Sequence, residues 1–300
     1  MSGGYQLIQL KNGSWSVRSI AEGETFHPVV GPVAEAEALY VRQLRLADRA
    51  AGTGEPFVLW DIGLGAAANV LTALRALRVT ARRVEVVSFD HTLAPLEFAL
   101  SNATVLGYVE GFELAIQTLL EQRSVEFTQG PMTVSWRVVE GDFPTLAAEA
   151  GATDWPTPHG ILFDAFSPAR NPAMWTLPLF RRLRELASPD RPCALATYSR
   201  ATLVRVTLLL AGWQVGVGHA TGEKDETTVA ANRPDLIAEP LDREWLLRAR
   251  RSTSAEPLHT AQYCQQPLSE PSWDALLRLP QFQPSEPTES LPATGPASPG

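Results

Sequence analysis

The stretch PFVLWDIGLGAAAN, residues 56–69, is the part of the chain that decides the fold. It opens with an apolar run that is typical of a buried strand. Asp61 ends this run, a turn with Gly63 and Gly65 follows, and an apolar helical pattern continues from Val70. Strand, glycine turn and helix in this order predict the first unit of an open α/β fold, where backbone N–H groups at the helix start bind an anionic part of a ligand.

The glycine turn admits two interpretations. It fits Gly-x-Gly-x-x-Ala, a variant of the dinucleotide-binding fingerprint, and it also fits Asp-x-Gly-x-Gly-x-Ala, in which an acid precedes the glycines. Both glycines permit a sharp turn and leave room for a ligand beside the backbone. A tight connection without a ligand remains a third interpretation of the same residues.

A second stretch, FDAFSPARNPAMW at residues 163–175, indicates a site. An apolar run ends at Asp164, a polar loop with two prolines follows, and Trp175 opens an apolar helical pattern. Open α/β folds bind ligands where buried parallel strands end, and a carboxylate there is typical of such a site. Because Asn-Pro and Ser-Pro are also ordinary turn formers, a loop that only connects is the alternative.

Two further predicted strands, residues 83–89 and 134–139, end near acids as well. The four strand ends together predict a row of carboxylates along one sheet edge: Asp61, Asp90, Asp142 and Asp164. A carboxylate at Asp90 can accept both hydroxyls of a ribose, and Asp142 can receive an adenine amino group. Each acid taken singly also suits a helix N-cap.

The remaining pattern predicts a hairpin over residues 5–20, a helix over 33–48, and an extra helix over 110–123 that would cover the pocket. Residues 213–217 and 227–231 are expected to pair as a terminal antiparallel hairpin. We predict four segments: an N-terminal extension (1–50), a catalytic α/β domain (51–232), a C-terminal extension (233–280) and a disordered tail rich in Pro, Ser and Glu (281–300).

Composition narrows the class of protein. Hydrophobic residues make up 45% of the chain, enough for one full α/β core. Two cysteines and five histidines form no metal or disulfide pattern, and we find no signal peptide or membrane-length apolar run, so a cytoplasmic protein without metal is expected. A net charge of −8 argues against nucleic acid. Three arginine clusters suit either phosphate contacts or solvated faces: Arg181, Arg182 and Arg184; Arg200 and Arg205; Arg248, Arg250 and Arg251.

The loop at residues 164–175 resembles the pattern Asp-Gly-Phe-Ala/Ser-Pro-Ala-Lys/Arg-Asn-Pro-x-Met-Trp of the MnmC-type methyltransferases, a family of class I S-adenosylmethionine-dependent enzymes. Similar pieces occur at residues 24–35, 196–213 and 218–226, so the resemblance spans about residues 20–232. The chain departs from the family where Ala67 replaces a third glycine, Ala165 replaces the glycine after the acid, and Asp225 replaces an arginine.

The resemblance implies a Rossmann-like fold with a mostly parallel sheet, a terminal antiparallel strand and an N-terminal extension. It also implies methyl transfer from S-adenosylmethionine to an amine, the aminomethyl group of the wobble uridine in tRNA (nm5s2U to mnm5s2U). Because the sequence shows no second glycine-rich dinucleotide motif, neither the flavin-dependent oxidase half of the family nor FAD is expected. The departures leave the acceptor less certain than the methyl donor.

The residues expected at the site follow from the two stretches and the resemblance. Asp164 is the expected catalytic residue, because an aminomethyl acceptor must lose a proton before it attacks. Donor-binding residues are expected to be Asp61, Gly63, Gly65, Asn69, Asp90, Asp142 and Asp164. Acceptor-binding residues are expected to be Phe166, Arg170, Asn171, Trp175, Lys224 and Glu226. Three other functions stay open: a methyltransferase for a small molecule or protein, an NAD(P)-dependent oxidoreductase, and a non-catalytic binding module if Ala67 blocks the donor.

Overall fold

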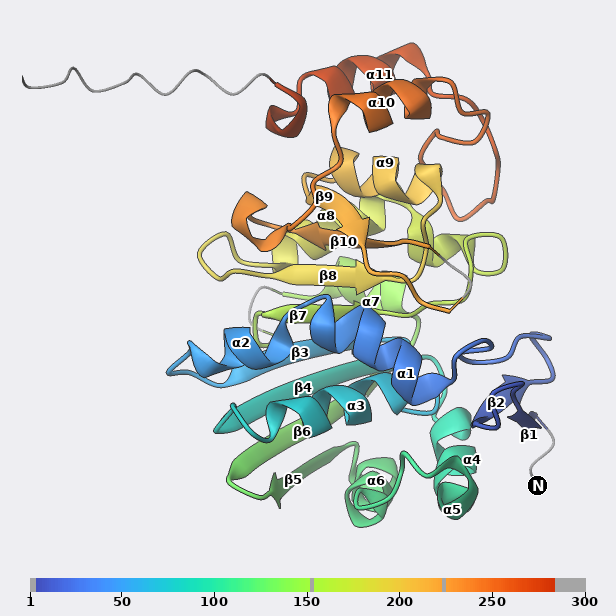
Figure 1. The fold of residues 1–300 in the computed structure, drawn as a ribbon, viewed down its shortest axis with the longest axis vertical. Helices are drawn as coiled ribbons and strands as arrows, with labels where there is room; N and C mark the ends of the chain where they lie inside the picture. The colour runs from blue at the N-terminus through green and yellow to red at the C-terminus, as the bar shows by residue number, and fades with distance from the viewer. Residues whose placement is uncertain (1–3, 152–153, 223–224, 284–300) are drawn as a thin grey trace, which may run out of the picture.

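An eight-stranded sheet forms the centre of the molecule, with helices on both faces (Figure 1). The computed structural model describes residues 4–151, 154–222 and 225–283. The strand order is β5-β6-β4-β3-β7-β8-β10-β9. In chain order the strands are β3 (Phe57–Ile62), β4 (Arg83–Asp90), β5 (Ser124–Gln129), β6 (Met132–Glu140), β7 (Gly160–Phe163), β8 (Ala194–Thr197), β9 (Gln214–Gly218) and β10 (Thr227–Ala231). The Rossmann-like fold expected from the sequence is confirmed.

The direction of the strands places a crevice at the middle of the sheet. Strands β6, β4, β3, β7 and β8 are parallel, whereas β5 and β10 run antiparallel to their neighbours. The chain moves outward from β3 to β4 and β6, then returns to β7 on the other side of β3. At such a switch the neighbouring loops leave toward opposite faces, and a crevice opens at the carboxyl ends of the strands.

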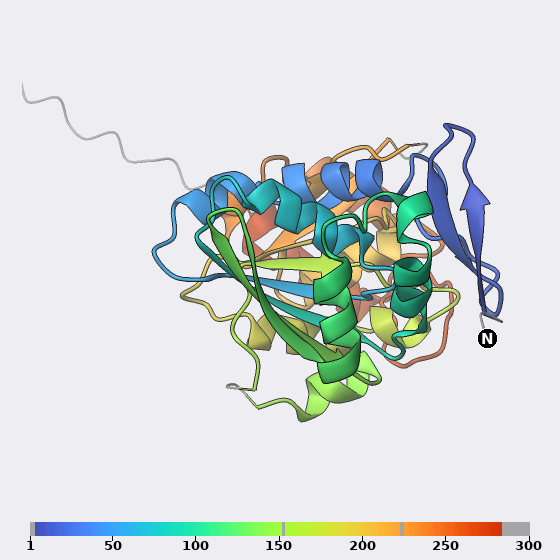
Figure 2. The same cartoon turned by 90° about the horizontal axis from the view of Figure 1, so that it is seen from below.

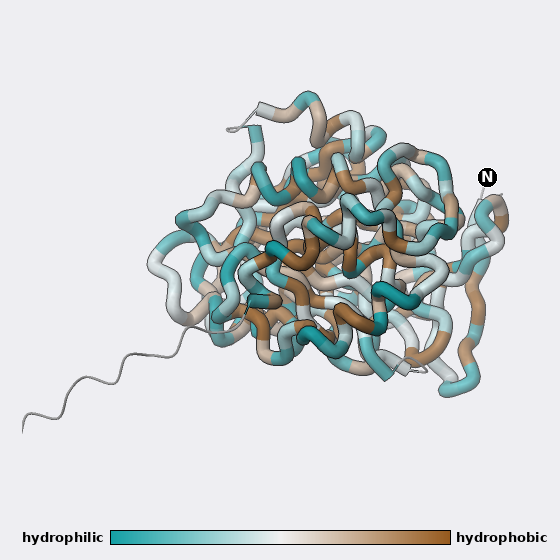
Figure 3. Tube along the Cα trace, turned by 90° about the horizontal axis from the view of Figure 1, so that it is seen from above, coloured by the Kyte–Doolittle hydropathy of each residue, from teal (hydrophilic) through white to brown (hydrophobic). Residues whose placement is uncertain are grey.

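Alternating side chains of the central strand separate two hydrophobic cores. Every residue of β3 is buried, with Leu59 in one core and Val58 and Trp60 in the other. The first core is covered by α1 (Pro32–Ala36), α2 (Leu46–Ala51), α3 (Ala68–Leu77), α4 (Ala94–Ser101), α5 (Ala103–Leu106) and α6 (Glu113–Gln122). The second is covered by α7 (Phe143–Glu149), α8 (Leu177–Leu186), α9 (Thr202–Leu210), α10 (Arg243–Arg250) and α11 (Glu270–Leu277). Figure 3 shows hydrophobic segments inside the molecule and hydrophilic segments on its outer loops.

The N-terminal segment contributes to the core as well as to the surface. The expected hairpin is confirmed as β1 (Tyr5–Gln9) paired with β2 (Trp15–Ser19). The helix expected over residues 33–48 is instead divided into α1, a π-helix (Glu37–Arg42) and α2. Between the π-helix and α2, Arg45 adopts a left-handed conformation with φ of 50°, which interrupts the helix there. Tyr40 of the π-helix is completely buried, which ties this segment to the sheet.

The helix expected over residues 110–123, which was predicted to cover the pocket, forms as α6 but lies elsewhere. Helix α6 packs against α4 and β5, and none of its residues lines the central cavity. Figure 2 shows α6 in front of the sheet and the hairpin at the right. Helix α4 contacts that hairpin, since the rings of Phe98 and Tyr5 lie 6.1 Å apart. The edge strand β5, which the sequence analysis missed, pairs antiparallel with β6 and alternates exposed and half-buried residues. That alternation is the signal that would have revealed it.

The C-terminal part packs on the second core. The expected terminal hairpin of β9 and β10 is confirmed. Asp242 and Ser269 cap α10 and α11 through their side chains. A 3-10 turn (Pro280–Phe282) follows, in which Phe282 is buried and Gln281 hydrogen-bonds to the backbone of β9. The predicted tail therefore does not begin at 281, and residues 284–300 lie outside the described part of the chain.

Candidate functional site

A cavity of about 850 Å³ opens where β3, β4, β6 and β7 end. The glycine turn and the loop after β7 form its inner wall, and residues 18–28 after the β1–β2 hairpin form the opposite wall. Nine of the expected site residues line this cavity: Gly63, Gly65, Asn69, Asp90, Asp142, Asp164, Phe166, Arg170 and Asn171. Residues that are distant in sequence thus meet at the switch of the sheet.

The two glycines of the turn are required by close contacts. Gly63 has a φ of 92°, and a Cβ atom there would lie 2.6 Å from the carbonyl oxygen of Asp164. Gly65 has a φ of 50°, and a Cβ atom would lie 3.3 Å from the ring of Phe26. Left-handed backbone and lack of space both exclude larger residues, so the turn forms a smooth cradle in the cavity wall.

Ala67, the departure at the third glycine, lies outside the cavity wall. The residue is fully buried in the first core and does not line the cavity, unlike its neighbours Ala66 and Ala68. Its backbone is left-handed, with φ of 63°. A negative φ would have accommodated the methyl group without strain. The methyl group therefore strains the backbone without narrowing the space for a ligand.

Two of the acids that follow strands organise the cavity wall. Asp90 accepts a hydrogen bond from the backbone N–H of Gly65 at 2.9 Å, which ties the glycine turn to β4. Asp142 caps α7 by accepting from the backbone N–H and hydroxyl of Thr145 at 3.2 and 2.7 Å. Both carboxylates also line the cavity. Asp142 therefore caps the helix and also presents its carboxylate to the cavity.

Asp61 lies beneath the cavity wall and does not line it. Its Oδ2 accepts a hydrogen bond from the hydroxyl of Ser88 at 2.9 Å, while Oδ1 has no hydrogen-bond partner among the described residues. Complete burial, opposed by the Ser88 hydrogen bond and reinforced by the charges of Asp164 and Asp90, raises the pKa of Asp61 to about 7. A direct contact with a ligand in the cavity is therefore not supported for this residue.

Asp164 stands between the glycine turn and the opposite wall. Its backbone N–H donates to Ile62 at 2.9 Å, which continues the sheet into the loop, and its Oδ2 accepts from the Nδ2 of Asn69 at 2.7 Å. Asn69 belongs to the first turn of α3. The carboxylate is therefore oriented by the helix that follows the glycine turn, and its side chain keeps 20% of its surface exposed.

Two residues that were not among the expected site residues, His27 and Glu35, also line the cavity. His27 places its imidazole between two carboxylates, with Nε2 3.9 Å from Asp164 Oδ2 and Nδ1 3.9 Å from Glu35 Oε1. The segment that carries His27 is held by the backbone N–H of Phe26, which donates to Val17 at 2.8 Å. Residues 24–35 resemble the family, and this resemblance was the available signal. No local sequence pattern shows which residue of an irregular segment contacts a distant strand end.

Aromatic and charged residues form the rim. The rings of Phe26 and Phe166 lie 6.2 Å apart and tilted, one on each wall. Arg170 lies 3.8 Å from Glu24, with 59% of its side chain exposed. Six carboxylates line the cavity, Glu22, Glu24, Glu35, Asp90, Asp142 and Asp164, against two arginines among the described residues, Arg18 and Arg170. The cavity therefore presents an excess of negative charge.

Two expected acceptor-binding residues, Trp175 and Glu226, do not line this cavity. Trp175 is fully buried and donates from Nε1 to the carbonyl of Phe166 at 2.8 Å, so it supports the loop from below. Glu226 lies in a separate cavity, where it pairs with Arg205. Lys224 lies outside the described residues. The spacing along the chain could not separate residues that support the loop from residues that face the cavity.

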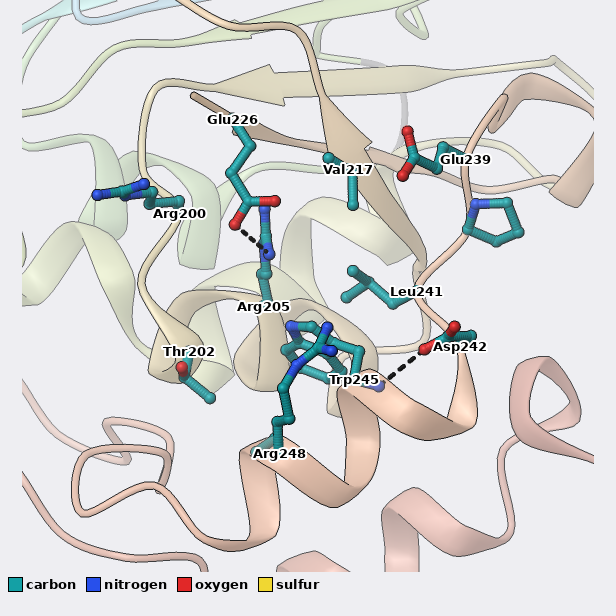
Figure 4. Close-up of a pocket in the computed structure, with 12 residues that line it drawn as sticks. Arg200, Thr202, Arg205, Val217, Glu226, Glu239, Leu241, Asp242, Trp245 and Arg248 are labelled. Atoms are coloured by element: carbon teal, nitrogen blue, oxygen red, sulfur yellow. Dashed lines mark hydrogen bonds and ion pairs between the residues drawn. The ribbon is translucent and has the colours of Figure 1, made fainter. Parts of the chain in front are cut away.

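The separate cavity, about 360 Å³, lies between α9, the β9–β10 hairpin and α10 (Figure 4). Arg205 is buried there and donates to Glu226 at 3.1 Å and to the carbonyl of Thr227 at 2.7 Å. Among the described lining residues, three arginines (Arg200, Arg205 and Arg248) face three acids (Glu226, Glu239 and Asp242), so the charges balance. This lining does not form a positive surface.

Two arginines of the cluster on α8 stabilise the fold by binding backbone carbonyls. Arg182 donates to the carbonyls of Ala147 and Ala150 at 3.0 and 2.6 Å, and Arg184 donates to the carbonyl of Gly212 at 3.2 Å.

No cluster of three or more His, Cys, Asp or Glu side chains able to hold a metal occurs in residues 4–151, 154–222 and 225–283. No helix within these ranges is long and apolar enough to cross a membrane.

A parallel sheet with a glycine turn after its first strand, acids at the following strand ends and a cavity at the switch point is the arrangement expected of a class I S-adenosylmethionine-dependent methyltransferase. Residues 118–233 match a family described as S-adenosyl-L-methionine-dependent methyltransferase. Other similarities indicate which kind of methyltransferase this chain resembles. It resembles MnmC2 from Aquifex aeolicus, whose crystal structure superposes with a TM-score of 0.66 at 25% identity over 92% of this chain and 85% of that one.

Curated relatives show the same similarity. The chain is 29% identical over 248 residues to the tRNA 5-methylaminomethyl-2-thiouridine biosynthesis bifunctional protein MnmC of Methylibium petroleiphilum, which covers 79% of this chain and 36% of that protein. It is 28% identical to the MnmC protein of Cupriavidus necator over 75% of this chain and 35% of that protein. The chain thus spans about a third of the length of these relatives. The MnmC-type resemblance inferred from the loop motif is confirmed.

Proposed function

We propose that this protein methylates an amine, and that its acceptor is the aminomethyl group of the wobble uridine in tRNA (nm5s2U to mnm5s2U). The observation that carries the proposal is the position of Asp164 beside the glycine cradle, in a cavity with six carboxylates and two arginines among its described lining residues. Such a lining attracts a reacting group that is an ammonium ion and disfavours a reacting group that is an anion. The names of the curated relatives supply the tRNA acceptor.

The cavity fits S-adenosylmethionine, a cation whose nucleoside and amino acid parts need a long cleft. Gly63 and Gly65 leave the space that a Cβ atom would fill. Asp90 and Asp142 offer carboxylates for the ribose and the adenine, and Asn69 has a buried Oδ1 without a hydrogen-bond partner among the described residues. When bound there, S-adenosylmethionine supplies an activated methyl group, so the protein mainly aligns donor and acceptor.

Residues on the rim are suited to the acceptor nucleotide. Phe166 and Phe26 flank the entrance with aromatic faces, on which a base turned out of its stack could pack. Arg170, which is mostly exposed, would contact a phosphate, and Asn171 would contact a base edge. A tRNA acceptor would also place the protein in the cytoplasm.

Asp164 would take the proton of the acceptor. An aminomethyl group is an ammonium ion in neutral water, and its nitrogen has no lone pair for attack until the proton leaves. Oδ2 of Asp164 is oriented by Asn69 at 2.7 Å, and the carboxylate faces the cavity, so it can hold the ammonium and accept its proton. The same charge would favour the bound amine over a neutral hydroxyl acceptor.

Methyl incorporation tests the proposal. The protein is incubated with labelled S-adenosylmethionine and tRNA that lacks the terminal wobble methyl group, and nucleosides are analysed by mass spectrometry. We expect mnm5s2U in the product, and loss of incorporation in Asp164→Asn with donor affinity retained. Asp48→Asn, an exposed carboxylate remote from the cavity, is the matched control and should remain active.

Three results would contradict the proposal. Donor binding without incorporation into this tRNA would exclude the wobble uridine and leave a small-molecule or protein amine as the acceptor. Binding of NAD in place of S-adenosylmethionine by calorimetry would contradict the cofactor, and binding of neither would indicate a non-catalytic module. Full activity of Asp164→Asn would remove Asp164 from the proton transfer while leaving the acceptor assignment intact.

A further inference from the structure

We propose that His27 is a positioning residue that draws the acceptor proton from Asp164 toward Glu35, through an imidazole held between the two carboxylates. The inference rests on the proposed function, because it concerns the proton of an amine acceptor. It adds a route by which that proton leaves Asp164. Without such a route, the carboxyl of Asp164 would hold the proton beside the nitrogen that must attack.

The three side chains form a line along the cavity wall, in the order Asp164, His27 and Glu35. Both ring nitrogens of His27 lie 3.9 Å from a carboxylate oxygen, one on Asp164 and one on Glu35. The side chains of His27 and Glu35 are only 9% and 12% exposed, so water does not surround them. These distances exceed a hydrogen bond by about an ångström, and contacts of this kind often shorten when the substrate binds.

The backbone at His27 is strained. The residue has a φ of 49°, in the left-handed region that non-glycine residues seldom occupy. Its neighbours hold it there, because the N–H of Phe26 donates to Val17 and the hydroxyl of Ser16 donates to the carbonyl of Phe26. Strain that the surrounding structure maintains is typical of residues whose position serves function. In this case it places the imidazole between the two acids.

The charges around His27 favour its protonation near neutral pH. Burial alone would lower the pKa of His27, but the nearby carboxylates of Glu35 and Asp164 outweigh it and raise the pKa above its ordinary value. Tyr40 from the π-helix and Tyr198 after β8 also surround the two carboxylates. Burial and these same negative charges raise the pKa of both phenols well above 10, so they stay neutral.

Other charged groups near the segment have partners or lie beneath it. Glu24, on the same segment as His27, pairs with Arg170 at the rim. Asp61 lies under the wall with a pKa of about 7. His27 is therefore the titratable group that lies between Asp164 and Glu35, and an imidazole can pass a proton in either direction.

The proton steps balance as follows. The N–H bond of the acceptor ammonium breaks, an O–H bond forms on Asp164, and the electron pair remains on the nitrogen. Asp164 then gives this proton to Nε2 of neutral His27, and His27 gives the proton on Nδ1 to Glu35. Asp164 is again a carboxylate, His27 is again neutral with its proton on Nε2, and Glu35 holds one proton until it is released to solvent.

The pH dependence of kcat with saturating donor and tRNA is the first measurement. For the wild type we expect kcat to fall as the pH decreases through the raised pKa of His27, because the imidazolium cannot accept a proton. In His27→Gln we expect kcat to be about 100-fold lower, with that acidic limb lost and the KM for tRNA little changed. His259→Gln, an exposed histidine outside the cavity, is the matched control and should keep the wild-type profile.

Chemical rescue separates a proton route from a structural role. Imidazole added to His27→Ala should restore part of kcat, in proportion to the concentration of its neutral form, whereas a purely structural defect would not follow that concentration. A wild-type kcat and pH profile in His27→Gln would overturn the inference. So would the same loss of kcat at every pH in His27→Gln together with no rescue by imidazole.

Histidine titration by NMR tests the arrangement without any acceptor. The pKa of His27 in the protein with and without S-adenosylmethionine should be lower in Glu35→Gln and in Asp164→Asn than in the wild type. An unchanged pKa in both variants would overturn the inference even if tRNA is methylated. Conversely, a shifted pKa with no methylation of tRNA would contradict the proposed acceptor while the coupling of His27 to both acids stands.

Discussion

Replacing Gly63 by alanine tests how the glycine turn and the catalytic loop depend on each other. A Cβ atom at this position would lie 2.6 Å from the carbonyl oxygen of Asp164 and 3.0 Å from its carbonyl carbon, where ordinary contacts begin near 3.4 Å. The peptide of Asp164 would therefore have to move by about 0.8 Å, the difference between these distances. The backbone of the turn would also be strained, since φ at Gly63 is 92°.

Both effects can be given a magnitude. The left-handed conformation costs an alanine about 1–2 kcal/mol. Forcing a methyl group into occupied space costs a further 1–3 kcal/mol. The lower entropy of the unfolded alanine chain offsets about 0.4–1 kcal/mol. We therefore expect Gly63→Ala to lower the free energy of unfolding by about 2–4 kcal/mol, and to lower kcat/KM by about 100-fold because a displacement near 1 Å misaligns Asp164.

Gly111→Ala is the matched control. Gly111 has a φ of 82° but no heavy atom within 4 Å of the position of a Cβ, so this variant has the strain without the contact. Urea unfolding and methyl incorporation are measured for both variants. We expect Gly111→Ala to lose about 1 kcal/mol of unfolding free energy with activity unchanged. Equal stability and equal activity of the two variants would refute the reasoning, because the contact with Asp164 would then have no effect.

Three further predictions follow from single contacts. Removing the carboxylate that holds the N–H of Gly65 in Asp90→Ala should weaken donor binding by about 1–3 kcal/mol by calorimetry, and unchanged affinity would contradict the donor site. Because the folded chain holds a proton on Asp61 up to a pKa of about 7 while the unfolded chain releases it near 3.8, the unfolding free energy should fall by roughly 4 kcal/mol as the pH rises through this range. Asp61→Asn should remove that fall when the unfolding free energy is measured by urea titration at each pH. The same dependence on pH in the variant and the wild type would contradict the prediction. Glu226→Gln should destabilise the fold by about 3 kcal/mol, because buried Arg205 loses its charged partner. The KM for tRNA should stay unchanged, and a raised KM would instead assign Glu226 to acceptor binding.

Local patterns predicted the strands of the sheet well, for an identifiable reason. The continuous apolar run before Asp61 reports burial on both faces, and β3 is indeed buried along its length. Acids directly after such runs predicted side chains at one edge, since parallel strands end together, and Asp90, Asp142 and Asp164 line the same cavity. Where a strand was missed, at Ser124–Gln129, the alternating pattern was present in the sequence but was not used.

Residues that act through distant contacts were not predictable in the same way. Trp175 and Phe166 belong to one loop motif, yet the first is buried and supports the second from below. Glu226 follows a segment similar to the family, but its partner Arg205 holds it in another cavity. In each case the orientation of the side chain depends on packing between elements, which composition and spacing do not encode.

The sequence by itself determined the α/β class, the glycine turn and the acid that ends β7, because each depends on neighbours within a few residues and on the alternation of buried and exposed positions. Only the tertiary structure decided which segment closes the cavity. The imidazole of His27 meets Asp164 across 137 positions of the chain, and that contact exists because the β1–β2 hairpin and α1 pack at the switch of the sheet. Contacts between distant segments depend on how whole elements pack, so the second wall of the site could be found only in the folded chain.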